Sequence, residues 1–467
     1  MSSDKLIELL TALDAPQNNY GNYGRYYRGQ QPLAFLSKES LDAIGERLSH
    51  LVVNIPRLLV NSLAERMRIS GMTCDAADVW ADFILNDLDQ LAGVVHRSAL
   101  LYGQSFILVW GDGTRPVVTV ETPQQVQVLT DPATREITSA VKRWEDKAKH
   151  ETHAMLYLPD RVEHWRAKTV GAANTSLELV ETLDNPMGQV PVIRFLNADL
   201  ISDEGTSEIA DIMGLTDALS KLSTDMLTAS EFLAKPRRYL TGEPLLRVPV
   251  LDENGDPVTD ADGEPEETTA VSVPDNDRFM QAEGEHAKFG QLPGAPLDGF
   301  KNLVDIILSE ISSVSNLPPS YLGIVHSNPS SAEAIKSAEA GLISRATSKM
   351  SSFGRSWEAV GRLIASVRTG REPRTIQCRI KWADPNLRSE AQAADAAQKL
   401  HSEGLMSRKS ALRARGLSDD EIAEELDEIY REMQSEASAK ADPALMTFSK
   451  LQNDNGNMTY SGGNDDE

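Results

Sequence analysis

The chain has 467 residues, 40% hydrophobic and 25% charged, which is enough apolar material for the cores of roughly two to four subdomains. Its 70 acidic and 46 basic residues give a net charge of −24 at pH 7. That charge argues against a protein that grips nucleic acid through the phosphates, but not against a wall past which DNA slides. No apolar run is long enough for a membrane span, and residues 1–5 lack the pattern of a secretion signal.

The first hundred residues are expected to be mainly helical. Apolar side chains recur at helical spacing over 56–67 and over 79–101, and Pro56 suits a first helical turn. The aromatic stretch 19–27 is too rich in glycine for a helix. We interpret it as an arm packed on a neighbouring surface, in preference to a platform that stacks nucleic-acid bases. Cys74 and Cys378 belong to no CxxC pattern, which predicts free buried thiols in a reducing compartment.

From residue 105 to about 196 the apolar period changes from 3.6 to 2, which predicts strands. Residues 106–110 and 117–120 flank a turn at Gly111-Asp112-Gly113-Thr114, the signature of a hairpin. Six more short strands are expected at 124–129, 138–145, 153–158, 161–167, 176–182 and 191–196. The pattern predicts an α+β domain with a largely antiparallel sheet.

Three long helices follow, and a small insert separates the first two. Apolar stripes predict helices over 208–233 and 298–315, and between them 236–296 form a β-rich insert whose segment 252–267 is strongly acidic. The second helix stops at Leu317-Pro318-Pro319-Ser320-Tyr321-Leu322-Gly323, and a polar loop, 318–330, leads to the third helix. That helix begins at the capping box of Ser330 and Glu333, and its stripe to Val367 is close to a heptad repeat.

The C-terminal part is expected to contain a strand and shorter helices. The strand covers 375–382, and the helices cover 389–402 and 418–434, the second of them acidic. That acidity is read as a solvated helix side in preference to a binding surface. The last 25 residues are polar and rich in glycine and asparagine, which predicts a disordered tail.

A search for catalytic or ligand-binding motifs finds no phosphate loop, no GxGxxG fingerprint and no GxSxG nucleophile elbow. His150, His153 and His164 offer imidazoles, but the spacing of the first two is HxxH on a strand, so surface histidines are favoured over a metal site. Asp252, Asn254 and Asp256 open like a calcium loop. Pro257 and Gly263 then occupy positions that need Gly and Glu, so a hairpin with solvated carboxylates is favoured. No cofactor is predicted.

The order of these elements, with the L-P-P-S-Y-L-G stop, resembles the portal proteins of tailed double-stranded DNA bacteriophages. The stretches from Asn18 to Arg28 and from Pro56 to Met67 are similar to the siphophage branch that infects actinobacteria. The resemblance implies a non-enzymatic ring of about twelve copies at one capsid vertex. Double-stranded DNA would pass through it without sequence-specific binding during packaging and ejection. Its partners would be the terminase large subunit, a head-completion adaptor, and the major capsid and scaffolding proteins, with assembly in the host cytoplasm and no membrane contact.

The resemblance also implies a portal fold with a helical and β wing, a two-helix stem, a small β-rich clip, a tunnel loop, a long kinked helix and a helical crown. The segments carried over are the wing, 1–206 with 332–385; the stem, 207–234 and 297–316; the clip, 235–296; the tunnel loop, 317–331; the crown, 386–440; and the tail, 441–467.

The site residues fall into three groups under this resemblance. The tunnel-loop candidates are Tyr321, His326, Ser327, Asn328, Ser330 and Ser331. Candidates for basic rings in the channel are Lys301, Lys336 and Arg345, each with the alternative of a solvated helix charge. The clip residues expected to dock terminase and adaptor are Arg237, Arg238, Asp252, Asp256 and Asp260. Two other functions stay open: another virion or head–tail connector component, and a metal-dependent nuclease or hydrolase that uses the carboxylates of 252–267.

Overall fold

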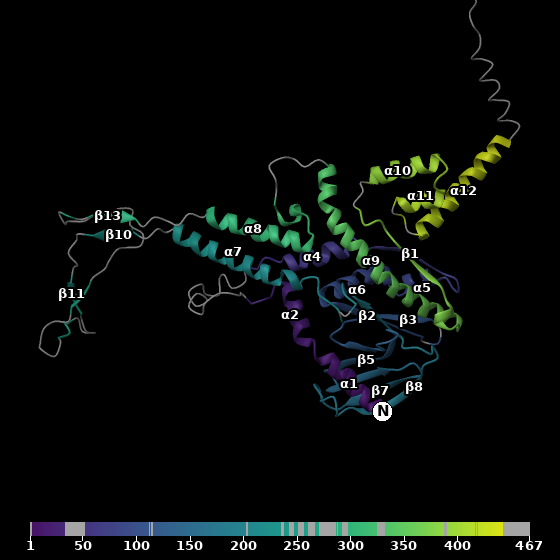
Figure 1. Ribbon diagram of the computed structural model, residues 1–467, viewed down its shortest axis with the longest axis horizontal. Helices are drawn as coiled ribbons and strands as arrows, with labels where there is room; N and C mark the ends of the chain where they lie inside the picture. Colours follow the sequence, from purple (N-terminus) through teal and green to yellow (C-terminus); the bar gives the residue numbers. More distant parts are fainter. Residues whose placement is uncertain are drawn as a thin grey trace, which may run out of the picture. The chain divides into compact units, whose positions relative to one another are not determined.

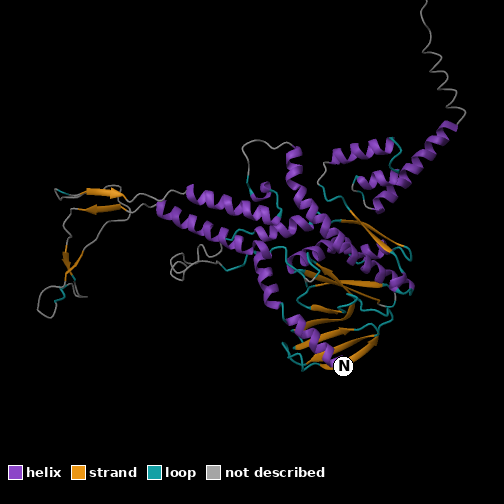
Figure 2. Cartoon of the chain, viewed as in Figure 1, coloured by secondary structure: helices purple, strands orange, loops and turns teal. Residues whose placement is uncertain are grey.

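A computed structural model describes residues 2–32, 52–111, 115–201, 204–234, 298–324, 332–386, 390–415 and 419–441, with short strands and single residues between 238 and 291 and the single residues 113 and 417. The chain divides into two compact units, drawn in Figures 1 and 2. Unit 1 comprises Met1–Pro32, Val52–Thr216 and Leu308–Glu467, and unit 2 comprises Leu33–Leu51 and Asp217–Ile307.

Unit 1 contains the antiparallel strands expected between residues 105 and 196. A three-stranded sheet has the order β3-β2-β9, with bounds Pro116–Glu121, Gln104–Gly111 and Val192–Leu196. A five-stranded sheet has the order β4-β5-β6-β7-β8, with bounds Val126–Thr130, Ile137–Asp146, Glu151–Tyr157, Arg161–Ala167 and Glu178–Asp184. All eight strand predictions in this region are confirmed, and so is the α+β class.

Both faces of the five-stranded sheet are covered. Neighbouring residues of a strand point to opposite faces, so Ala140 and Val141 of β5 belong to different clusters. On one face, helix α1 (Ser2–Asp14) buries four leucines against Val141, Leu156 and Trp165. On the other face, Ala140 packs with Phe106 of β2, which joins the two sheets into one core.

Helix α2 (Gln17–Arg28) contradicts the expectation that the aromatic stretch 19–27 is not helical. Tertiary packing explains the difference. Tyr20 is buried, and its hydroxyl accepts a hydrogen bond of 2.8 Å from Nε2 of Gln104. Gly24 faces the hydroxyl of Tyr102, where a Cβ would lie 3.4 Å from that oxygen. The cost of a helical glycine, about 1 kcal/mol, is therefore offset by a close approach that a larger residue would crowd.

Helices α4 (Ile55–Ala64), α5 (Val79–Leu85) and α6 (Leu88–Tyr102) account for the predicted helices 56–67 and 79–101. The second prediction is interrupted, because Asp87 takes a left-handed conformation with φ of 55° between α5 and α6. Such a residue cannot continue an α-helix. The apolar periodicity continues across the break, which is why the sequence alone did not reveal it.

Helix α9 (Ala332–Thr369) is the long third helix and passes through the core of unit 1. It packs on a two-stranded sheet formed by β1 (Ile69–Cys74) and β14 (Cys378–Trp382), which pair antiparallel. Gly361 makes this contact possible, since a Cβ there would lie 2.5 Å from Sδ of Met72 and 3.3 Å from Sγ of Cys378. The strand expected over 375–382 is confirmed, and Ser330 of the expected capping box lies outside the described residues.

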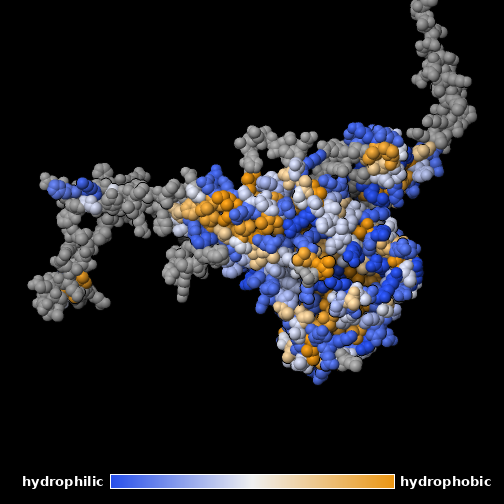
Figure 3. Space-filling view, viewed as in Figure 1, coloured by the Kyte–Doolittle hydropathy of each residue, from blue (hydrophilic) through white to orange (hydrophobic). Residues whose placement is uncertain are grey.

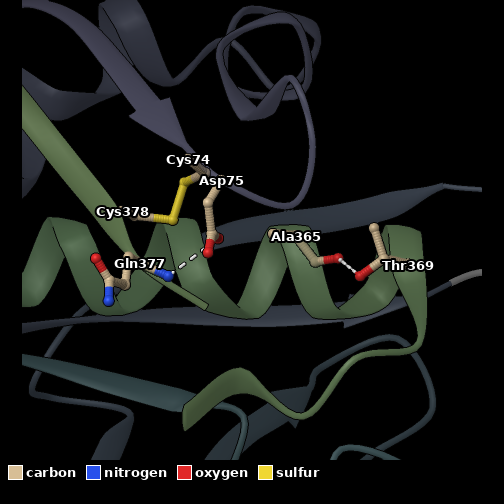
Figure 4. The surroundings of a disulfide bond; sticks show 6 residues. All are labelled: Cys74, Asp75, Ala365, Thr369, Gln377 and Cys378. Carbon is tan, nitrogen blue, oxygen red and sulfur yellow. Dashed lines mark hydrogen bonds between the residues drawn. A yellow bond between two sulfur atoms is a disulfide. The ribbon is translucent and has the colours of Figure 1, made fainter. Parts of the chain in front are cut away.

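Cys74 and Cys378 form a disulfide, so the prediction of free thiols is wrong (Figure 4). The two residues are directly paired across β1 and β14, with Cα atoms 4.1 Å apart and a sequence separation of 304. Asp75, beside the disulfide, accepts a hydrogen bond of 3.1 Å from the backbone N–H of Gln377. The pairing depends on two strands from opposite ends of the chain, which spacing within the sequence could not indicate.

The described residues of unit 2 include most of two helices and four short strands. Helix α7 (Met213–Ala234) follows a 3-10 turn at Ala210–Ile212, so the predicted helix 208–233 starts a few residues late. Helix α8 (Asp298–Ser315) matches its predicted bounds. Between them, β10 pairs with β13 and β11 with β12, confirming the β character of the insert; the bounds are Arg238–Thr241, Lys288–Gln291, Arg247–Pro249 and Glu267–Thr269.

Three helices end the described chain: α10 (Glu390–Ser402), α11 (Arg408–Ala414) and α12 (Asp419–Ala441). They confirm the helices expected over 389–402 and 418–434. The expected tail, 442–467, lies outside the described residues. None of the described helices has an apolar stretch that would cross a membrane.

His96 is a buried histidine in the core of unit 1, and it gives the fold a predicted sensitivity to acid. Its ring packs against Phe353 and Trp382, and Nε1 of Trp357 donates a 2.9 Å hydrogen bond to its Nε2. Burial lowers the pKa of His96 from 6.5 to about 3, with the charge of Arg97 lowering it further and the carbonyl of Met67 raising it. The folded protein therefore holds this ring neutral.

We expect the free energy of unfolding to fall as the pH drops below 6.5. The folded pKa lies below the unfolded value, so only the unfolded chain takes up this proton between pH 6.5 and 3. The contribution of His96 is fully present above pH 6.5, and about 2 kcal/mol of it is lost by pH 5. Denaturant titrations above pH 6.5 and at pH 5 should show a smaller loss of unfolding free energy in His96→Gln than in the unchanged protein. The glutamine keeps an acceptor for Trp357. The exposed His150→Gln is the control; equal losses in all three proteins would contradict the prediction.

Candidate functional site: the turn before α9 and its polar clusters

The chain leaves α8 through a sharply defined turn. Asn316, with φ of 56°, takes the left-handed conformation that ends the helix, and Leu317 after it is buried. Pro318 and Pro319 cannot continue α8, and they lead into a short 3-10 helix, Pro319–Leu322. Gly323, with φ of 77°, closes this helix through its backbone N–H. The predicted stop at L-P-P-S-Y-L-G is therefore a built turn, which delivers the chain to 325–331 just before α9.

A polar cluster of three side chains fixes this turn to the rest of unit 1. The hydroxyl of Tyr321 donates to Oε1 of Glu339 on α9 at 3.0 Å, and it accepts from Nη2 of Arg66 at 3.0 Å. The same Arg66 nitrogen lies 3.3 Å from Oε1 of Glu339, and the guanidinium stands over the Tyr321 ring at 5.8 Å from its centroid. Arg66, just past α4, is 5% exposed and Glu339 is 11% exposed. We call this set the tyrosine cluster; it holds the segments on both sides of 325–331 at fixed positions.

A second polar cluster lies one to three helical turns further along α9 and centres on Glu208. Its Oε1 forms an ion pair with Nζ of Lys349 at 2.9 Å and accepts a hydrogen bond from Nδ2 of Asn197 at 2.9 Å. Its Oε2 lies 2.6 Å from Nη2 of Arg345, as an ion pair whose alignment does not meet that of a hydrogen bond. Glu208 is only 2% exposed and Lys349 6% exposed.

Asp199 completes this second set, which we call the glutamate cluster. Its Oδ1 accepts from Nζ of Lys349 at 2.8 Å, and this hydrogen bond is the main cause of a lowered pKa of the Asp199 carboxyl. Nη1 of Arg345 also points to the carbonyls of Val314 and Ser315 at the end of α8, at 3.5 and 3.4 Å. The segment entering α7, the end of α8 and the body of α9 are therefore tied together by one ion network, which is buried at Glu208 and Lys349.

Only one of the tunnel-loop candidates lies among the described residues. Tyr321 is half-buried in the tyrosine cluster, whereas the rest lie outside the described residues: His326, Ser327, Asn328, Ser330 and Ser331. Among the candidates for basic rings, Lys301 on α8 and Lys336 on α9 are exposed. Arg345 is 21% exposed and ion-paired with Glu208, so its charge is already partly neutralised within the chain.

Two of the clip candidates can be placed. Arg238 belongs to β10, opposite Gln291 of β13, and Asp256 is exposed. The other clip candidates lie outside the described residues: Arg237, Asp252 and Asp260.

The histidines of the HxxH segment form a pair, with Nδ1 of His153 3.0 Å from Nε2 of His164 across β6 and β7. Both rings stack with Trp144, and partial burial, followed by the charge of His153, lowers the pKa of His164. Within the described part of the chain, no three side chains among His, Cys, Asp and Glu converge as metal ligands would.

Six residues of the two clusters were missed in the sequence: Arg66, Asn197, Asp199, Glu208, Glu339 and Lys349. A signal for two of them exists. Glu339 and Lys349 continue the apolar stripe of α9, at steps of three from Leu342 and Ala346. A charged residue on a buried helix face is costly unless it is paired, so its position there indicates a partner elsewhere in the chain. The partners themselves come from distant segments and could not be read from spacing.

The fold and the site define a class of protein: two helices around a small β-rich insert, then a Pro-Pro turn and a long helix clamped at its start. The chain belongs to the phage portal protein family, because residues 19–439 match the family described as "Phage portal protein, SPP1 Gp6-like". This confirms the family and the portal fold expected from the sequence. It also makes the chain a structural component of a phage virion.

Individual relatives agree. The chain is similar to the portal protein of Mycobacterium phage L5, with 28% identity over 419 residues, covering 85% of this chain and 82% of the relative. It is similar to the portal protein of Mycobacterium phage D29, with 29% identity over 435 residues, covering 88% and 85%. Among solved structures it is similar to the neck of a native gene transfer agent particle computed with C12 symmetry, with 12% identity, a TM-score of 0.45 and coverage of 85% of this chain and 93% of that one.

Proposed function

We propose that this chain forms a closed ring of about twelve copies at one vertex of the capsid, and that the ring is the channel through which DNA is packaged and ejected. The observation that carries the proposal is the family match over residues 19–439, together with the order of helix, insert, helix, turn and long helix. A ring subunit needs helices that line a hole and a segment that projects into it, and in the proposed ring α7, α8 and residues 317–331 would take these parts.

The proposed division of labour follows the segments. The stem would be 207–234 with 297–316, the clip 235–296, and the tunnel loop 317–331. The wing would be 1–206 with 332–385, the crown 386–440 and the tail 441–467. On α7, Lys221 and Asp225 form an ion pair one helical turn apart, and with Ser230 they would give the stem a polar face toward the channel.

In the proposed channel, the protein contacts the DNA only weakly. With a net charge of −24, the chain would repel phosphates over most of its surface, and small uncharged residues of the tunnel loop would touch the duplex without holding it. We further propose that the clip docks the terminase large subunit and then the head-completion adaptor. The capsid and scaffolding proteins would contact the ring during assembly in the host cytoplasm, and the chain would have no catalytic activity of its own.

The exposed side of helix α8 is an argument for the proposed ring. It carries apolar side chains that a single chain leaves in water. Leu303 is 48% exposed and Ile306 54% exposed, one helical turn apart on the same side. Figure 3 shows apolar side chains gathered over α7 and α8. Burying a side chain of this size contributes about 1.5–3 kcal/mol, and a closed ring repeats the contact in every subunit. In the proposed ring, a neighbouring copy covers this face.

The first test is the mass and shape of the purified full-length chain, by light scattering and negative-stain microscopy. Twelve copies of a 51.1 kDa chain should give particles of roughly 600 kDa with a central hole. A chain that stayed monomeric both alone and throughout capsid assembly would overturn the proposal.

Ile306→Asp is expected to raise the protein concentration at which rings form by roughly tenfold or more. The reason is that each subunit contact loses about 1.5–3 kcal/mol. Lys301→Asp makes a larger change of charge at an exposed position on another side of α8, because residues five apart lie roughly 140° apart around a helix, and it should still form rings. Rings of unchanged stability in Ile306→Asp would mean that this face of α8 is not a subunit contact.

A further inference from the structure

An arginine-lined cavity of about 900 Å³ lies in unit 1, away from the two polar clusters. Three turns meet around it: the end of the β2–β3 hairpin, the segment between β8 and β9, and the turn that follows α9. Four arginines line it, in a chain that is strongly acidic overall. They are Arg115, Arg368, Arg371 and Arg374.

The turn after α9 presents three of these arginines at regular intervals. Gly370, with φ of 69°, ends the helix, and its backbone N–H donates to the carbonyl of Ser366 at 2.8 Å. Pro373 then starts a 3-10 turn, Pro373–Thr375. Arg368, Arg371 and Arg374 are three residues apart along this segment, and all three are exposed.

In each of the three guanidinium groups, the described hydrogen bonds involve only Nε or Nη2. Asp82, which is 3% exposed, accepts from Nε of Arg368 at 2.9 Å and from its Nη2 at 2.5 Å. Nη2 of Arg371 donates to the carbonyl of Thr375 at 3.3 Å, and Nη2 of Arg374 donates to Glu136 at 2.6 Å. Among the contacts of the described residues, none engages Nη1 of any of the three arginines. An arginine held by one edge loses less freedom when its other N–H groups bind a planar oxyanion.

The remaining lining narrows the class of ligand. Trp110, Met187 and Val367 give the cavity apolar walls, whereas Asp184 and Glu372 add two carboxylates to its lining. Duplex DNA is too wide for a cavity of this volume. A peptide with a carboxylate beside an apolar side chain matches the lining, and the volume is within the range of pockets that enclose ligands.

We propose that this cavity is a docking site for an acidic peptide segment of a partner protein. A side-chain carboxylate of the segment binds the free edges of Arg371 and Arg374, and a neighbouring apolar side chain packs against Trp110 and Val367. Arg368, fixed by Asp82, sets the position of the carboxylate. The site does not depend on ring closure, because every lining residue belongs to one unit of one chain.

The test uses the full-length protein and isothermal titration calorimetry. The probe is a blocked peptide of alternating leucine and acidic residues, and its control is the same peptide with Gln and Asn in place of Glu and Asp. The acidic peptide should bind once per subunit and the amide peptide should bind at least roughly tenfold more weakly, since a hydrogen bond to a charged group contributes about 1.5–3 kcal/mol. Arg371→Gln and, separately, Arg374→Gln should each weaken the acidic peptide by roughly tenfold or more.

Arg355→Gln removes an exposed arginine of α9 outside the cavity and should bind the peptide like the unchanged protein. Circular dichroism of each variant shows whether it is folded. Equal binding of both peptides, or undiminished binding by both folded cavity variants, would overturn the proposal. Inorganic phosphate or a short DNA duplex that displaced the peptide at equal concentration would overturn it too, because the cavity would then select phosphate.

Discussion

Glu208→Gln is expected to lower the free energy of unfolding of unit 1 by about 3–5 kcal/mol, because it leaves Lys349 and Arg345 without the carboxylate that neutralises them. Lys349 is 6% exposed and cannot turn to water without leaving the core. Asp199 alone would remain beside it, at 2.8 Å. The loss should be measured by denaturant titration followed by tryptophan fluorescence, at one fixed protein concentration since ring formation adds to stability.

A second substitution distinguishes the cost of an unpaired buried charge from the cost of altered side-chain packing. Glu208→Gln combined with Lys349→Met removes one buried charge of each sign, and we expect it to recover a substantial part of the lost stability. Glu403→Gln, at an exposed position, is the control and should stay within about 0.5 kcal/mol of the unchanged protein. A loss below about 1 kcal/mol for Glu208→Gln would show that the glutamate cluster does not hold the segments around α9.

Removing the disulfide, by replacing both Cys74 and Cys378 with Ala, is expected to cost about 2–4 kcal/mol. The bond closes a loop of 304 residues, and a longer loop leaves the unfolded chain more freedom to regain when the bond is lost. Both cysteines lie where α9 packs on β1 and β14, so the folded structure has other contacts to hold the strands together.

The oxidation state of the unchanged protein provides the control for this prediction. Unfolding of the oxidised protein should require more denaturant than unfolding of the same protein after reduction, and the reduced form should match the double variant. Alkylation of both thiols in the native protein without a reductant, or identical midpoints with and without one, would contradict the pairing.

Local patterns predicted the elements of this fold well where a single period dominates. The strands between 105 and 196 and the helices 298–315 and 332–369 follow from periods of 2 and 3.6, since each buries one face along its whole length. The turn at Leu317–Gly323 was predicted for a similar reason, because two prolines end a helix wherever it packs.

The features that the sequence did not predict depend on distant segments. Helix α2 forms although it contains Gly21 and Gly24, because Tyr20 and Gly24 fit against Gln104 and Tyr102. The disulfide needs β1 beside β14, and the tyrosine cluster needs Arg66 beside Glu339. Each of these is decided by tertiary packing, which gives no local periodicity. The break between α5 and α6 was missed for another reason, since Asp87 adopts φ of 55° without glycine or proline to mark it.

The disulfide between Cys74 and Cys378 also changes the topology of the chain. Everything from Asp75 to Gln377, including α7, the insert with β10 to β13, α8 and all of α9, lies inside one covalent ring of the polypeptide. A single backbone cut anywhere in that stretch opens the ring without separating the N-terminal and C-terminal parts. Without a reductant, a protein cut once in the insert would therefore remain one molecule, heavier by one water. With a reductant, the same protein would separate into two fragments.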